Sequence, residues 1–207
     1  MKRTPHIGVV YPNYFPENFG EFITSDIRHE RLDLDLIRQE PEVWASLEWA
    51  IPGLIATYLF KPYFESFLKE AGKDHYQKLR NVLGELLKKS AEIPVHTVVS
   101  KKSTFKIDKS NSQSKAISIH IELKNGALLK LMFDNQMNSE IWVSFLDKML
   151  DMLDEHYDKF PNDNLTKRLN HLDFKNGKEV YSVINKNIED WEFLDWNAIL
   201  AMERGNS

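Results

Sequence analysis

An alternating apolar pattern around an Asn-Gly pair restricts the fold of this chain more than any other feature. Over residues 117–133, apolar side chains occupy every second position on both sides of Asn125-Gly126. Because the side chains of a strand alternate between the two faces of a sheet, this pattern predicts a hairpin with one apolar face. A three-residue loop that ends at Gly126 sets Ile121 opposite Leu129 and keeps that face apolar on both strands. We therefore expect this register, with Gly126 in a left-handed conformation.

Helical periodicity flanks the hairpin on both sides. Apolar residues recur at helical spacing over 41–89, where two prolines interrupt the pattern, and over 139–158. Residues 6–11 and 95–99 are rich in β-branched side chains and are predicted to be strands. The expected architecture is α+β, with a small antiparallel sheet formed by the hairpin 117–133 and the strand 95–99. That sheet is expected to pack against the helices 41–89 and 139–158.

The chain length favours one main domain. A chain of 207 residues buries enough surface to fold without a metal ion or a disulfide. We expect residues 1–160 to form a single α+β domain and residues 161–207 to form an acidic, partly helical extension that packs on it. The helical part of that extension is predicted from the spacing of Val180, Ile184 and Trp191.

The composition excludes several kinds of chemistry. The chain has no cysteine, which removes disulfides, thiolate zinc sites, iron–sulfur ligation and cysteine nucleophiles. Its formal net charge is −4, so there is no strong signal for nucleic-acid binding. The sequence has no glycine-rich phosphate loop with a lysine, and no serine is flanked by glycines two residues away on both sides. No cofactor and no metal ion is expected.

One acidic pattern leaves a hydrolase alternative open. Restriction-like nucleases hold magnesium with an acid on one strand and an acid-x-lysine group on the next. Asp108 together with Glu122 and Lys124 fits this arrangement, and the last two share one face of the predicted strand. The competing interpretation is a solvated sheet face, which needs no metal. A metal-dependent hydrolase or nuclease that uses these three residues is therefore an alternative hypothesis.

Two surfaces suggest a protein partner or self-association instead. The block 49–67 is unusually apolar for a segment with two prolines, and it is either the core helix of the domain or a partner-binding segment. Aspartates at helical spacing within 139–158 form an acidic stripe that suits a basic partner. The candidate partner-binding residues are Trp49, Leu54, Tyr58, Phe60 and Tyr63 from the apolar block, and Asp147, Asp151, Asp154 and Asp158 from the stripe.

No segment is predicted to cross a membrane. The most apolar stretch, residues 49–60, is shorter than the about 20 residues that a transmembrane helix requires. The first residues lack the long apolar run of a signal peptide. These features predict a cytoplasmic protein, and peripheral membrane contact through residues 49–67 is a further alternative.

The order of the predicted elements carries a family resemblance. The block Ile51–Tyr76, the hairpin around Asn125-Gly126 and the helix that ends near Tyr157 together resemble the small α+β accessory domains of bacterial conflict and signalling systems. The resemblance covers about half of the chain, implies an adaptor role in association, and supplies no active-site residues. Our leading hypothesis is therefore a non-enzymatic interaction or regulatory module of a bacterial system.

Overall fold

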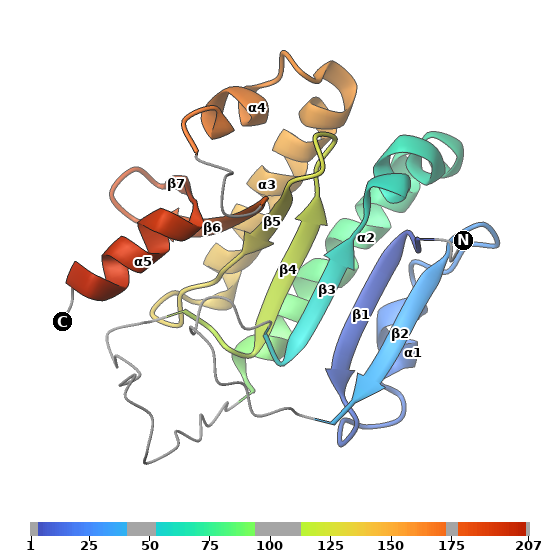
Figure 1. Ribbon diagram of the computed structural model, residues 1–207. Coiled ribbons are helices and arrows are strands. Elements are labelled where there is room, and N and C mark those ends of the chain that lie inside the picture. The colour runs from blue at the N-terminus through green and yellow to red at the C-terminus, as the bar shows by residue number, and fades with distance from the viewer. Residues whose placement is uncertain (1–3, 41–52, 94–112, 173–177, 206–207) are drawn as a thin grey trace.

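The computed structural model describes residues 4–40, 53–93, 113–172 and 178–205, which form one mixed sheet with helices on both faces (Figure 1). The strands are β1 (Ile7–Pro12), β2 (Leu34–Gln39), β3 (Ile55–Leu59), β4 (Ile117–Glu122), β5 (Leu128–Leu131), β6 (Glu179–Asn185) and β7 (Asp190–Leu194). The helices are α1 (Phe19–Thr24), α2 (Leu68–Ala91), α3 (Ser139–Lys159), α4 (Asn164–Leu169) and α5 (Trp196–Gly205). A π-helical turn, η2 (Tyr63–Phe67), precedes α2.

The sheet has seven strands in the order β2-β1-β3-β4-β5-β6-β7. The pairs β2–β1, β3–β4 and β5–β6 are parallel, and the pairs between them and at the β7 end are antiparallel. A helical connection joins each parallel pair, as parallel strands require. The predicted small antiparallel sheet is therefore wrong, because the hairpin 117–133 lies inside a larger mixed sheet. The predicted strand 95–99 lies outside the described residues.

Two segments that were predicted to be helical form strands. Residues 55–59, inside the predicted helix 41–89, form β3, and residues 179–194 contain β6 and β7. β3 is buried along nearly its whole length, and a strand buried on both faces gives an apolar run that periodicity does not separate from a helix. In β6, the four-residue spacing of Val180 and Ile184 fits a helix, but an even spacing also keeps both side chains on one face of a strand.

The hairpin and two other elements agree with the sequence prediction. Ile121 lies opposite Leu129 in the β4–β5 ladder, and Gly126 has a left-handed φ of 78°. Helix α3 covers the predicted helix 139–158, and β1 covers most of the predicted strand 6–11. These elements depend on turn chemistry and on periodicity within one segment, so local sequence is sufficient to predict them.

Helices α2 and α3 pack side by side on one face of the sheet, here called the inner face, and enclose the main core (Figure 1). Ile119 and Leu131 of the central strands are fully buried against them. Helix α5 lies on the opposite, outer face, where Ile199 joins a smaller apolar cluster with Tyr181 and Leu194. None of the described helices combines the length and the apolar character needed to cross a bilayer.

The connections that contain α2 and α3 have opposite hands. The chain moves in the same direction across the sheet from β3 to β4 as from β5 to β6, but these two strand pairs run in opposite directions. Because α2 and α3 contact each other on one face, one connection is right-handed and the other is left-handed. Such connections are almost always right-handed, so one of the two is an exception to this rule.

Candidate protein interface at a sheet edge

Strand β2 forms one edge of the sheet and exposes one side of its backbone (Figure 1). In a strand, the N–H and C=O groups of one residue point to the same side, and this side alternates along the chain. The carbonyl groups of Asp33 and Gln39 accept hydrogen bonds from amides at the two ends of β1, so the odd-numbered residues face β1. Leu34, Leu36 and Arg38 therefore point their N–H and C=O groups away from the sheet, and no described residue pairs with them.

The side chains of β2 divide between a covered face and an open face. Leu34 and Leu36 are partly buried and pack against the core from the inner face. On the outer face Asp35, Ile37 and Gln39 are exposed, and Ile37 keeps 48% of its surface accessible. An exposed isoleucine beside unpaired backbone groups is a combination that edge strands usually avoid through charges, prolines or bulges.

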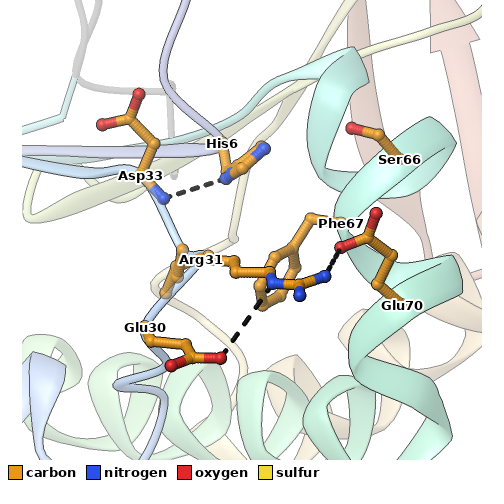
Figure 2. Close-up of a pocket in the computed structure, with 8 residues that line it drawn as sticks. His6, Glu30, Arg31, Asp33, Ser66, Phe67 and Glu70 are labelled. Carbon is orange, nitrogen blue, oxygen red and sulfur yellow. Dashed lines mark hydrogen bonds and ion pairs between the residues drawn. The ribbon is translucent and has the colours of Figure 1, made fainter.

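The start of β2 is fastened to β1 and α2 by side chains that line an open pocket of about 570 Å³ (Figure 2). His6, just before β1, accepts a hydrogen bond from the Asp33 amide at its Nδ1 atom, with a distance of 2.9 Å. Arg31 donates to Glu70 of α2 at 2.7 Å and lies 4.0 Å from Glu30. Because two carboxylates already engage Arg31, we interpret this pocket as the anchor of β2.

Aromatic packing extends this anchor into the core. The rings of His6, His29 and His75 lie 5.2, 5.3 and 4.7 Å from the ring of Phe67. His75 donates from Nε2 to a backbone carbonyl after α1 at 2.8 Å, so its Nδ1 atom accepts from the Tyr63 hydroxyl at 3.1 Å. Burial lowers the pKa of His75, which keeps the ring neutral and both hydrogen bonds intact.

Strand β7 forms the opposite edge, and side chains of the same chain engage the outward backbone groups of Trp191. The Trp191 amide donates to the carboxylate of Asp190 at 2.8 Å, and the Trp191 carbonyl accepts a hydrogen bond from Arg168. Arg168 also pairs with Asp190 at 2.9 Å and lies over the ring of Phe193. Helix α4, whose N-cap is Asp163, positions Arg168 beside this edge.

Asp163 and His156 form a buried pair that ties α4 to the hairpin turn. Both side chains are 0% exposed, and the Nδ1 atom of His156 lies 3.0 Å from the Asp163 carboxylate. The Nε2 atom of His156 accepts a hydrogen bond from the Lys124 amide at 3.2 Å, so the ring proton lies on Nδ1 and is donated to Asp163. A backbone amide therefore occupies the nitrogen that a catalytic histidine would use, and the pair has a structural role.

The outer face carries a row of polar and aromatic side chains. The strand register places Tyr58, His120, Lys130 and Tyr181 side by side. Burial lowers the pKa of His120 to about 3 and that of Lys130 to about 8, with Glu179 opposing the second shift. The His120 Nε2 atom lies 2.9 Å from a serine hydroxyl on the same strand, as in a nucleophile–base pair. A base with a pKa near 3 is weak at neutral pH, so the row supports no catalytic assignment.

The predicted residues of the apolar block lie in different settings. Tyr63 is fully buried in the core. Tyr58 and Phe60 are half-buried, with their rings stacked at a centroid distance of 6.0 Å. Leu54 is also half-buried, and Trp49 lies outside the described residues. The structure therefore does not gather the described members of this set on one exposed surface.

Part of the acidic stripe on α3 is engaged within the protein. Arg80 of α2 forms ion pairs with Asp147, at 3.5 Å, and with Asp151. Asp154 and Asp158 are exposed. The first two aspartates thus hold the two core helices together, and only the last two face solvent without such a partner among the described ion pairs.

The residues of the hydrolase alternative are also engaged. The Glu122 carboxylate accepts a hydrogen bond from the Lys61 amide at 3.0 Å, and the Lys124 ammonium donates to the Tyr157 carbonyl at 2.9 Å. Asp108 lies outside the described residues. Within the described part of the chain, no three histidine, aspartate or glutamate side chains converge as metal ligands.

Sequence reasoning missed the edge strand, although a signal for it was present. Leu32, Leu34 and Leu36 alternate with Asp33 and Asp35, which is the period of a half-buried strand. The surrounding charges obscured this pattern. Strand order in a sheet is a long-range property, so no local pattern indicates that this strand lies at an edge.

Comparison of the chain with protein-family models, with curated proteins and with solved structures finds no match in any of the three. What this protein does is therefore inferred from the geometry of its described residues.

Proposed function

We propose that this protein is a non-enzymatic interaction module that binds a partner by adding a strand of that partner to β2. The observation that carries this proposal is the row of outward backbone groups on Leu34, Leu36 and Arg38, with which no described residue pairs. A partner strand would satisfy these groups through main-chain hydrogen bonds. The exposed side chains of Asp35 and Ile37 would select among partner sequences.

The anchoring of β2 supports this role. The hydrogen bond from Asp33 to His6 and the contact of Arg31 with Glu70 hold the entry to the strand. Arg38 donates from its guanidinium to the Asn13 carbonyl at 2.8 Å, which holds the other end. A strand that is already fixed in its bound geometry loses little conformational freedom when a partner pairs with it.

No comparable observation favours the other hypotheses. Glu122 and Lys124 are engaged in hydrogen bonds that join β4 to neighbouring segments, so the hydrolase alternative gains no support from them. An adaptor or regulatory role in a bacterial system and a cytoplasmic location are part of the proposal, in keeping with the resemblance and the composition described above.

A proline substitution tests the proposal. Leu36→Pro removes one outward N–H group, and Leu36→Ala loses similar side-chain packing but keeps that group. We expect proteins recovered from host cells to bind wild type and Leu36→Ala but not Leu36→Pro. Amide hydrogen exchange on the recovered complex is expected to slow at Leu34, Leu36 and Arg38. Equal recovery by all three proteins, or no protection at these amides, would refute the proposal.

A further inference from the structure

The partner strand can be specified further from the residues of β2. We infer that it is β2 of a second copy of this chain, paired antiparallel about a twofold axis that passes beside Ile37. This inference rests on the proposed function, because it names the occupant of the same edge. The contacts along the strand distinguish this register from the adjacent one, in which the axis passes beside Leu36.

Symmetry limits the registers that two copies of β2 can adopt. A twofold axis perpendicular to the sheet makes the strands antiparallel and keeps the two outer faces on the same side. Outer-face residues then oppose outer-face residues, so the axis lies beside a residue, and the registers that pair most of β2 (Leu34–Gln39) have it beside Leu36 or Ile37. In both registers the outward N–H and C=O groups of one strand meet those of the other.

The side chains favour the axis beside Ile37. In this register Ile37 opposes Ile37 of the other copy, and Asp35 opposes Gln39, so no like charges meet along the described strand. The 48% of the Ile37 surface that is accessible in the single chain would then be covered by an identical apolar side chain. The register centred on Leu36 would instead set the Asp35 carboxylate opposite Ile37, which leaves a charge against an apolar side chain on both sides of the axis.

The surroundings of the strand leave this edge accessible. In the sheet order β2 has a neighbouring strand on one side only, and Figure 1 shows no strand beyond it. The Arg38 guanidinium is held by the carbonyl groups of Asn13 and Phe15, at 2.8 and 3.0 Å, on the inner side of the sheet. The backbone of Arg38 is therefore presented to a second copy, and its charge is directed away from the contact.

Cysteine cross-linking tests the register directly, because the chain has no cysteine of its own. Opposed residues of a pair without mutual hydrogen bonds have Cα atoms about 4.5 Å apart, which is within the range that a disulfide spans. Mild oxidation is expected to link Ile37→Cys to itself, and to leave Asp35→Cys unlinked as the matched control. Cross-linking only in a mixture of Ile37→Cys and Asp35→Cys would show the Leu36-centred register and overturn the one inferred here.

Charge reversal tests the same contact without a covalent bond. Light scattering is expected to give twice the chain mass for wild type, and dimers at least about tenfold weaker for Ile37→Lys and for Ile37→Glu, because each sets like charges across the axis. Mixing the two variants is expected to restore the dimer. If wild type is monomeric at the concentration used for cross-linking, the inference is wrong. If Leu36→Pro still abolishes binding of a partner in that case, the proposed function stands without the dimer. If the wild type is monomeric and Leu36→Pro binds partners as well as wild type does, both the proposed function and the inferred dimer are wrong.

Discussion

The two edges of the sheet end in different ways. At β7 the carbonyl of Trp191 is bonded to Arg168 and its amide to Asp190, so of the outward groups only those of Phe193 have no described partner. At β2 the outward groups of Leu34 and Leu36 have no described partner, and an exposed isoleucine lies beside them. Because unpaired strand edges promote association, the difference indicates that β7 is better protected from other chains than β2.

The largest expected effect on stability is at Asp163, which caps α4, the helix that places Arg168 beside β7. Asp163 is buried, caps α4 and accepts the proton of His156. Asp163→Ala is expected to lower the free energy of unfolding by about 3 kcal/mol, because it removes a cap and leaves a buried donor unpaired. Urea unfolding measures this change. Asp158→Ala, an exposed site on α3, is the control, with a change below about 0.5 kcal/mol. Equal effects would show that the buried pair does not hold α4 in place.

Substitution of Arg168 itself is expected to have the next largest effect on stability. Arg168→Met keeps an apolar stem over Phe193 but removes the donors to Trp191 and Asp190. We expect a loss of about 2 kcal/mol in unfolding free energy, since one buried carbonyl loses its partner. Light scattering is also expected to show new association through the uncovered edge. Lys167→Met, an exposed neighbour on α4, is expected to change neither property. A variant as stable and monodisperse as this control would contradict the proposed protection of β7.

The pH dependence of stability tests His120, which lies on β4 in the middle of the sheet, between the two edges. The pKa of His120 is about 3 in the folded protein against an ordinary value of 6.5, so the unfolded chain takes up a proton that the folded chain excludes. Stability from this residue is present above pH 6.5 and is lost as the pH falls towards 3, by about 1.4 kcal/mol per pH unit. His120→Phe keeps a ring against Tyr58, so its advantage over wild type should grow in acid. The difference in unfolding free energy between His120→Phe and wild type at pH 7.5 controls for changes in packing. If this difference stays constant across the pH range, the pKa of His120 is not lowered.

The smallest effect is expected at the open edge. Ile37 is exposed, so Ile37→Thr should change the unfolding free energy of the dilute single chain by less than about 0.5 kcal/mol. The same variant should weaken association, because the apolar contact is lost. Urea unfolding and light scattering on the same samples separate these two effects. A large loss of stability would mean that Ile37 belongs to the core, and the contrast between the edges would lose its basis.

The sequence predicted the elements whose signals are local. The Asn125-Gly126 turn and the alternation around it specify the β4–β5 register, because both strands of a hairpin lie within one short segment. β3 was mistaken for part of a helix because its residues are buried on both faces, which removes the alternation. The parallel pairing of β3 with β4 joins segments more than fifty residues apart in the chain, and no local pattern specifies such a pair.

The candidate site was less predictable than the fold. Leu34 and Leu36 alternate with aspartates and indicate a strand, but a strand does not show from its own residues whether it has one neighbour or two. The edge is defined only after β1 has paired with β2 on one side and β3 on the other. The candidate residues predicted from the sequence stand out instead by their apolar or acidic character. Several of them stabilise the protein itself: Tyr63 is buried in the core, and Asp147 pairs with Arg80 of the neighbouring helix.

The covering of β7 determines how far any assembly of this chain extends. If two copies join through β2, their sheets become one continuous sheet whose two outer ends are both β7. At each end Arg168 and Asp190 engage the outward groups of Trp191, so a third copy finds only the outward groups of Phe193 to pair with. Growth into a fibre, which is the hazard of proteins with two open edges, is therefore disfavoured beyond the pair.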